Sequence, residues 1–164
     1  MLLLSQPTPV VAESIALSSS QIELISAYCT ESRGHLERLR SADALQRVNL
    51  GQRYENISMK LMAPLNSRIA LAGRDGLELA KTTVEFNQEL TSFRKTYLDY
   101  DNQIDDIIRM DCKKYPVEFY QQLEAAREKR QELSDSVGKI NQLIKRYQTE
   151  FESFAAGINQ GVSK

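Results

Sequence analysis

Apolar side chains in the last third of the chain recur at alternating intervals of four and three residues, without a break, from Phe119 to Ile158. This heptad pattern predicts a long α-helix that packs along one stripe against neighbouring helices. Only Arg130 departs from apolar character, and its guanidinium either reaches the edge of the stripe or pairs with an acid from another helix. The stripe comprises Phe119, Leu123, Ala126, Arg130, Leu133, Val137, Ile140, Ile144, Tyr147, Phe151, Phe154 and Ile158.

The middle of the chain has the same alternation and is rich in aromatic residues. Four of its seven stripe positions are Phe or Tyr, which makes a thick stripe suited to packing against two partner helices. A cofactor-binding box is the alternative interpretation of such a stripe. Its positions are Phe86, Leu90, Phe93, Tyr97, Tyr100, Ile104 and Ile107.

The first segment is less regular. Its stripe is interrupted for eleven residues between Leu39 and Leu50, which predicts local unwinding or a bend. Pro64 predicts a further kink or a break near Ala63, because proline disrupts the helix before it. The stripe positions are Ile22, Ile25, Cys29, Ser32, Leu36 and Leu39, then Leu50, Tyr54, Ile57, Leu61 and Leu65.

The fold class is therefore predicted to be all-α, with helices over residues 20–72, 76–113 and 116–158. Short connections between them predict an elongated antiparallel three-helix bundle of coiled-coil type, a rod of roughly 55–80 Å at ~1.5 Å per residue. A break in the first segment would instead give a four-helix up-down bundle. Capping boxes are expected at Ser20 with Glu23 and at Asp75 with Glu78. The bundle domain spans residues 13–158, and residues 159–164 are expected to fray.

Residues 1–12 are interpreted as the remnant of a signal peptide. Val10 and Ala12 have the small-residue spacing that a signal peptidase accepts, although the apolar run before them is short and has no basic residue. A disordered tail is the alternative. The rest of the chain contains no run near the ~20 apolar residues that span a bilayer. The sequence thus predicts an exported protein with no membrane span in the mature chain.

Cys29 and Cys112 are predicted to form a disulfide, since a separated pair in an exported chain is commonly bonded. Two buried free thiols are the alternative. A hairpin that turns near residues 73–75 would set Cys112 opposite residue 36, about 10 Å from Cys29 at helical rise. A bend at Pro64, or a connection over Asp111–Tyr115 that extends past the helix, would remove this mismatch.

The residues needed for catalysis or cofactor binding are scarce. His35 is the single histidine, which argues against a metal centre and against nucleophilic triads, and there is no glycine-rich phosphate loop. Basic residues are interspersed with acidic ones at a net charge of −1, which argues against nucleic-acid binding. We expect no enzymatic activity, no cofactor and no metal. The acidic cluster, expected to face water, is Asp99, Asp101, Asp105, Asp106 and Asp111.

The residues around the second cysteine resemble those of small exported helical proteins, uncharacterised in function, of ultrasmall bacteria with reduced genomes. The resemblance rests on Asp111-Cys112, Tyr115-Pro116, Phe119-Tyr120, Leu123, Ala126-Arg127 and Arg130, with partner positions Cys29, Leu39, Tyr54, Leu65 and Arg68. It covers most of residues 20–150. It implies a cell-envelope or extracellular setting and assigns no catalytic or binding residue.

The leading functional hypothesis is a structural or interaction protein of the cell envelope, a helical rod that docks a protein partner or a second copy. One alternative is a periplasmic holdase-type chaperone. Another is a small-ligand binder that uses the aromatic stripe around Tyr97 and Tyr100. That second alternative requires a cavity of ~300 Å³ or more.

Overall fold

A computed structural model describes residues 16–162. Residues 1–12, predicted to be the remnant of a signal peptide, lie outside the described part. The prediction of an all-α fold is confirmed, and residues 16–162 contain no strand. The elements are α1 (Ser19–Ala27), α2 (Cys29–Asn56), the π-helix η1 (Ile57–Met62), α3 (Ala63–Leu71), α4 (Leu77–Arg109) and α5 (Pro116–Val162).

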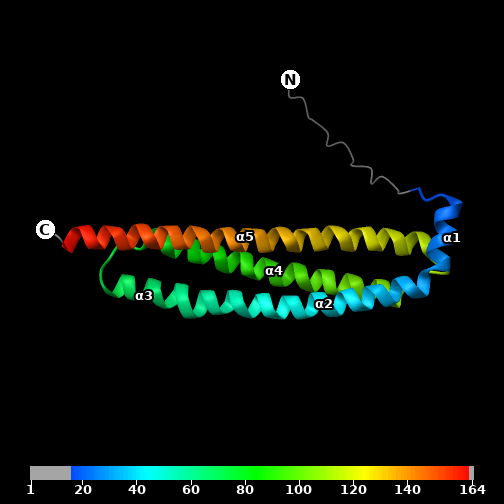
Figure 1. Cartoon of the computed structure of the whole chain (residues 1–164), viewed down its shortest axis with the longest axis horizontal. Helices are drawn as coiled ribbons and strands as arrows, with labels where there is room; N and C mark the ends of the chain where they lie inside the picture. Colours follow the sequence, from blue (N-terminus) through cyan, green and yellow to red (C-terminus); the bar gives the residue numbers. More distant parts are fainter. Residues whose placement is uncertain (1–15, 163–164) are drawn as a thin grey trace, which may run out of the picture.

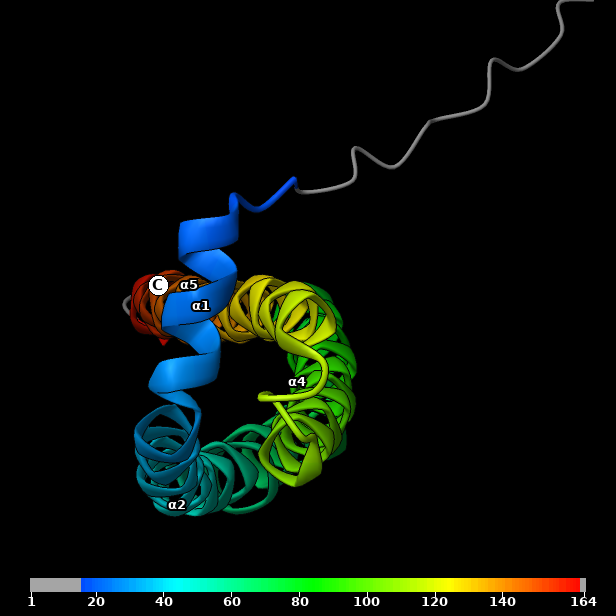
Figure 2. The ribbon, with the colours of Figure 1, turned by 90° about the vertical axis from the view of Figure 1, so that its right-hand side faces the viewer.

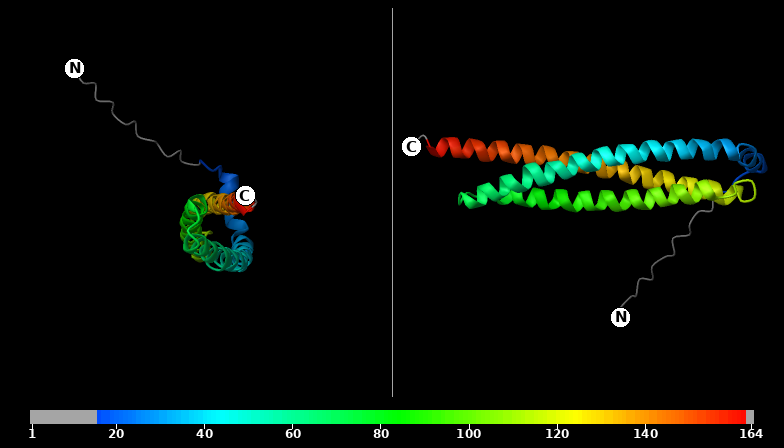
Figure 3. Two further views of the ribbon diagram at one scale, coloured as in Figure 1. Left: turned by 90° about the vertical axis from the view of Figure 1, so that its left-hand side faces the viewer. Right: turned by 90° about the horizontal axis from the view of Figure 1, so that it is seen from below.

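The helices form an elongated bundle (Figure 1). The elements α2, η1 and α3 follow one another as one long rod, α4 returns beside it, and α5 runs back along α4 (Figures 1 and 3). The helix α1 turns away from this rod and lies across one end of the bundle. At about 1.5 Å per residue, the 47 residues of α5 extend roughly 70 Å, and the helix continues past the predicted end at residue 158.

The amino-terminal cap is Ser18 and not Ser20, so the predicted cap is wrong. The Ser18 side chain accepts a bond from the backbone of Gln21, whose side-chain oxygen accepts from the Ser18 N–H at 2.8 Å. The run Ser18–Ser20 offers two boxes of equal spacing, Ser18 with Gln21 and Ser20 with Glu23, and the structure uses the first. The predicted box at Asp75 is also wrong, because Gly76 is the N-cap of α4 and makes no side-chain cap.

The kink expected at Pro64 takes the form of a π-helical turn. The Ala63 N–H donates to the carbonyl of Ser58, five residues earlier. The proline ring would clash with the carbonyl four residues before it in a regular α-helix, and the wider π turn relieves that clash. The chain therefore stays helical from Cys29 to Leu71.

The second long helix ends at Arg109, earlier than the predicted residue 113. Met110 is extended, and the Asp111 carboxylate accepts from the backbone N–H groups of Lys113 (3.1 Å) and Lys114 (3.2 Å), which favours a turn over helix. Cys112 consequently lies in the connection past the helix end, and that position removes the register mismatch. The Cys29–Cys112 disulfide is present, with the Cα atoms 5.6 Å apart.

The apolar stripes lie in the bundle interior to different degrees. All seven positions of the middle stripe are buried in α4. In α5 the side chains of Phe119, Ala126, Ile140 and Tyr147 are buried. Of the remaining stripe positions, Leu123, Leu133, Val137, Ile144, Phe154 and Ile158 are half-buried, and Arg130 and Phe151 are exposed.

The placement of Phe151 contradicts its assignment to the core stripe. Its side chain is 38 % exposed, whereas Tyr147, four residues earlier, is 8 % exposed. Phe154, three residues later, is half-buried and packs against the buried cluster that contains Tyr147, so the packed line of α5 passes beside Phe151.

Candidate functional site

The helices α2 and α5 are separated by a groove. Both pack against α4, yet within the described residues no Cα of α2 comes within 8 Å of a Cα of α5. The end-on view in Figure 2 shows α4 connecting the two helices on one side and α1 crossing between them at the near end. The groove thus has α4 as its floor, α2 and α5 as its walls, and α1 at one end.

The groove contains two cavities, arranged one after the other along the bundle. The end compartment, beside α1, has a volume of about 510 Å³ and is lined mainly by Leu36, Leu39, Ile104, Phe119, Leu123 and Ala126. The middle compartment has a volume of about 430 Å³, and its lining mixes apolar and aromatic residues (Leu50, Phe93, Tyr97, Leu133 and Val137) with polar ones (Asp43, Gln46, Arg47, Gln131 and Ser134). Tyr100, Arg127 and Arg130 line both compartments.

A bridge of three side chains crosses the groove where the compartments meet. The Arg130 guanidinium donates to both carboxylate oxygens of Asp43, at 3.0 and 3.1 Å. The Tyr100 hydroxyl donates to the same carboxylate at 2.6 Å. Because these residues belong to α5, α2 and α4, the bridge fixes the width of the groove. The Asp43 side chain is only 14 % exposed.

The bridge also sets the protonation of its members. Burial, followed by the hydrogen bond to Asp43, raises the pKa of Tyr100 well above its ordinary value. The hydrogen bond to Asp43 raises the pKa of Arg130. At neutral pH Tyr100 is therefore a neutral hydrogen-bond donor and Arg130 a permanent cation.

The alternative that Arg130 pairs with an acid from another helix agrees with the structure. Asp43 was not identified as that acid from the sequence. Asp43 lies seven residues after Leu36 and seven before Leu50, so it occupies an inward heptad position in the irregular part of the first segment. A polar residue at such a position, facing the one polar position in the last stripe, is the signal that could have identified the pair.

The floor of the middle compartment is aromatic, with a cation above it. The guanidinium carbon of Arg47 lies 4.8 Å from the ring centroid of Tyr97, a cation–π arrangement. Burial raises the pKa of Tyr97, so its hydroxyl stays protonated. The predicted aromatic stripe around Tyr97 and Tyr100 therefore borders open space as well as packed core.

The predicted acidic cluster is engaged by an arginine. Arg40 donates to both oxygens of Asp101 (2.9 and 3.0 Å) and also to Asp105. The hydrogen bond from Arg40 holds the pKa of Asp101 below its ordinary value. Across residues 16–162 no three Asp, Glu, His or Cys side chains are grouped as a metal site. These aspartates hold α2 against α4.

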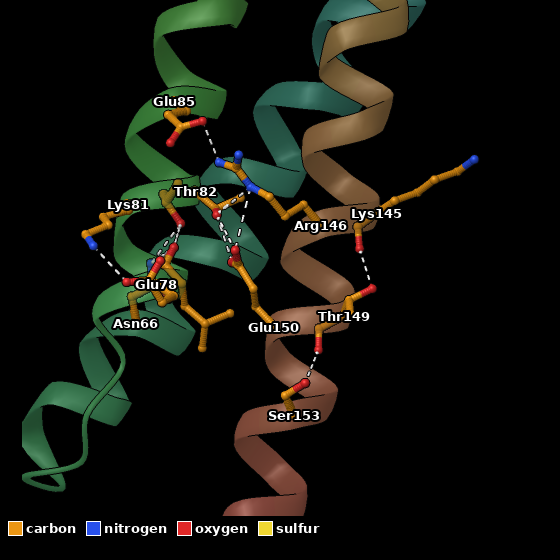
Figure 4. Close-up of polar contacts among 12 residues, drawn as sticks. Asn66, Glu78, Lys81, Thr82, Glu85, Lys145, Arg146, Thr149, Glu150 and Ser153 are labelled. Atoms are coloured by element: carbon orange, nitrogen blue, oxygen red, sulfur yellow. Dashed lines mark hydrogen bonds and ion pairs between the residues drawn. The ribbon is translucent and has the colours of Figure 1, made fainter.

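A second polar network joins α4 to α5 near the end opposite α1 (Figure 4). The buried Thr82 hydroxyl donates to the Glu150 carboxylate, whose oxygens lie 2.8 and 2.9 Å away, and accepts from Arg146 Nε at 3.0 Å. Arg146 also pairs with Glu85 at 2.5 Å. Since each polar group is satisfied by its neighbours, this network stabilises the helix pair.

His35 lies on α2 at the rim of the end compartment. Its ring Nδ1 is 2.8 Å from the Arg38 guanidinium, and its Nε2 is 3.6 Å from Glu31. The side chain is 63 % exposed, so His35 is a largely solvated residue, as expected.

Comparisons with protein-family models, curated proteins and solved structures found no match to this chain. None of the described helices is long and apolar enough to cross a membrane.

Proposed function

We propose that this protein is a non-enzymatic, exported binding protein that holds an apolar small molecule in the groove between α2 and α5. The observation that carries the proposal is the pair of cavities of about 430 and 510 Å³, whose walls are mainly apolar. Ligand pockets of proteins commonly have volumes of ~300–1,000 Å³, an apolar lining and a few polar groups. Both volumes exceed the ~300 Å³ that the ligand-binding hypothesis requires. Tyr100 lines both spaces.

The chemistry of the groove supports holding a ligand. Its ionisable groups are permanent cations, tyrosines kept neutral by burial, the solvated His35, and one carboxylate. That carboxylate, Asp43, already accepts from Arg130 and Tyr100. Such groups orient a bound molecule by hydrogen bonds and charge.

The export part of the proposal is supported by the disulfide. Cys29 and Cys112 are both buried and bonded to each other. Disulfides persist in oxidising compartments such as the periplasm and the extracellular space.

Titration with the neutral, polarity-sensitive dye Nile red tests the binding proposal. We expect saturable binding with a fluorescence increase, lost in Leu123→Trp, whose indole would fill the end compartment. The matched control is Leu98→Trp, on the exposed face of α4, where Leu98 is 53 % exposed. Circular dichroism checks that both variants fold. Equal dye binding by the two variants, or no binding by the parent protein, would overturn the proposal.

A docking scaffold is the second candidate, favoured by apolar residues on the outside of the rod. Leu45 and Met59 are each 65 % exposed and Val48 is 44 % exposed, on the face of α2 and η1 turned away from the core. A second copy or a protein partner would cover these side chains. Light scattering after size-exclusion chromatography tests self-association: a dimer that Leu45→Lys converts to a monomer supports it, and a monomer at all concentrations contradicts it.

A further inference from the structure

Resting on the proposed function, we infer that the ligand is a single-chain amphiphile with an anionic headgroup. Its alkyl chain lies in the end compartment, and its headgroup binds Arg127 and Arg130 where the two compartments meet. The inference depends on the apolar walls of that compartment, on the sign of the charges that line it, and on the bridge that limits its length.

The end compartment is a mainly apolar space. Its walls are Leu36 and Leu39 on α2 and Phe119 and Leu123 on α5, and Ile104 forms part of its floor. Leu36, Ile104 and Phe119 belong to the same buried cluster as the disulfide, and the half-buried Ile25 of α1 packs against that cluster. At ~1.5 Å per residue, the stretch of α2 from Ser32 to Asp43 spans roughly 16 Å, the length of a medium-length alkyl chain.

The ionisable side chains that line the end compartment itself are all basic. Among the residues that line the end compartment, the ionisable side chains are His35, Arg127 and Arg130, and none is a carboxylate. Arginine binds carboxylate and phosphate groups through paired, charge-assisted hydrogen bonds. Asp43 and Glu124 each pair with one of these arginines, whose remaining N–H donors suit an anion better than a cation.

Both arginines can take a headgroup without losing the bridge. Arg130 uses Nε and Nη2 for Asp43, and a guanidinium has five N–H donors, so donors on Nη1 and Nη2 remain. Arg127 pairs with Glu124 of its own helix, and its side chain is 62 % exposed. Such exposed pairs contribute little, so a headgroup that also meets Arg130 can compete for Arg127.

The Asp43–Arg130 bridge favours a small amphiphile over a peptide helix. A helix laid along the groove would have to pass through the point where the two side chains join α2 to α5. Breaking that pair would leave Asp43, which is mostly buried, without its cation. A ligand confined to the end compartment leaves the bridge intact.

Displacement of Nile red by four twelve-carbon compounds tests the inference. Dodecanoate and dodecyl phosphate carry an anionic headgroup, dodecanol is neutral, and dodecyltrimethylammonium is cationic; each is used below the concentration at which it aggregates. We expect at least one of the two anions to displace the dye at about tenfold lower concentration than dodecanol, with the cation weakest. The stronger anion identifies the headgroup as carboxylate or phosphate.

Variants on one helix separate the headgroup contact from general effects. Arg127→Gln should weaken the binding of the preferred anion about fivefold to tenfold and leave dodecanol unchanged. The matched control is Arg146→Gln, which removes an ion-paired arginine of α5 outside the groove and should change neither ligand.

The outcomes distinguish the inference from the proposed function. Equal affinity for dodecanol and for both anions, or no effect of Arg127→Gln, would overturn the anionic headgroup while dye binding keeps the groove as a binding site. Failure of Nile red and of all four compounds to bind would overturn both.

Discussion

The helix α5 meets its two neighbours in different ways. Against α4 it buries Ile140 in one cluster with Phe86, Leu90 and Phe93 and adds polar contacts along the edge, such as Ser136 to Glu89 at 2.6 Å. Within residues 16–162 its polar contact with α2 is the Arg130–Asp43 pair, and Leu123 and Val137 stay half-buried beside the cavities.

This difference shows that one heptad pattern can serve two purposes. The stripe positions from Phe119 to Val137 border the two compartments, whereas Ile140 and Tyr147, further along the same stripe, lie in a buried cluster. The apolar surface that α5 turns toward α2 lies outside the tightly packed part of the bundle, where it is available to a ligand.

Removal of the disulfide should have the largest effect. The bond closes a loop between residues 83 apart in the sequence. In the chain-entropy treatment, replacing both Cys29 and Cys112 by Ser therefore lowers the free energy of unfolding by roughly 4 kcal/mol. Urea denaturation measures it. In hydrogen exchange, we expect α1 and the start of α2 to lose protection while the middle of α4 and α5 keeps it. A loss spread evenly over all helices would contradict the division into a packed pair and an open groove.

The same substitution in the two regions should have unequal costs. Leu90→Ala in the packed region, where Leu90 is 4 % exposed, should destabilise the protein by about 3 kcal/mol, since it creates a cavity in a closed core. Leu123→Ala on the groove should cost about 1 kcal/mol, because the side chain already borders open space. Chemical denaturation of both variants measures the difference. Equal costs would mean that the groove is closed in solution.

Loss of the bridge between Asp43, Tyr100 and Arg130 should have a smaller effect on stability. Asp43→Ala leaves the buried Tyr100 hydroxyl without its acceptor and should cost about 1–2 kcal/mol. Asp135→Ala is the matched control, since Asp135 is exposed and bonded to Gln131 of the same helix; it should stay within about 0.5 kcal/mol of the parent. Thermal denaturation of Asp43→Ala, Tyr100→Phe and the variant with both changes completes a double-mutant cycle. Additive effects of the two changes would show that Asp43 and Tyr100 are not energetically coupled.

The smallest effect concerns the Arg40 contacts at acidic pH. The pKa of Asp101 is lowered from 3.8 in the folded state, so its contribution is present above pH 3.8 and is lost as pH falls through the lowered value. We expect stability to fall by about 1 kcal/mol more in the parent protein than in Asp101→Asn over that range. Urea denaturation from pH 5 to pH 2 measures the difference. Parallel curves for the two proteins would show that Asp101 contributes nothing.

The sequence was sufficient for the packed pair and insufficient for the groove. The stripe from Phe86 to Ile107 predicts the buried positions of α4 correctly, because all seven of its side chains are packed in the bundle interior. Heptad spacing does not specify the distance to the neighbour, so Leu123 and Phe151 look the same as Phe119 in the sequence. The end of α4 at Arg109 depends on the Asp111 side chain, which competes locally with helical hydrogen bonds. The change of direction between α1 and α2 at Tyr28 could not be predicted, because no proline or glycine lies beside it in the sequence.

The π-helical turn at Ile57–Met62 determines which face of α2 borders the groove. It takes up an extra residue within the helical rod, and each residue of an α-helix corresponds to a rotation of about 100°. Regularising that turn to α-helix without deleting a residue, as Pro64→Ala would allow, would rotate everything upstream by about that angle relative to α3. Asp43 and Arg47 would then point away from the cavities. The rotational phase of the whole amino-terminal half is thus controlled by a single irregular turn far from the cavities themselves.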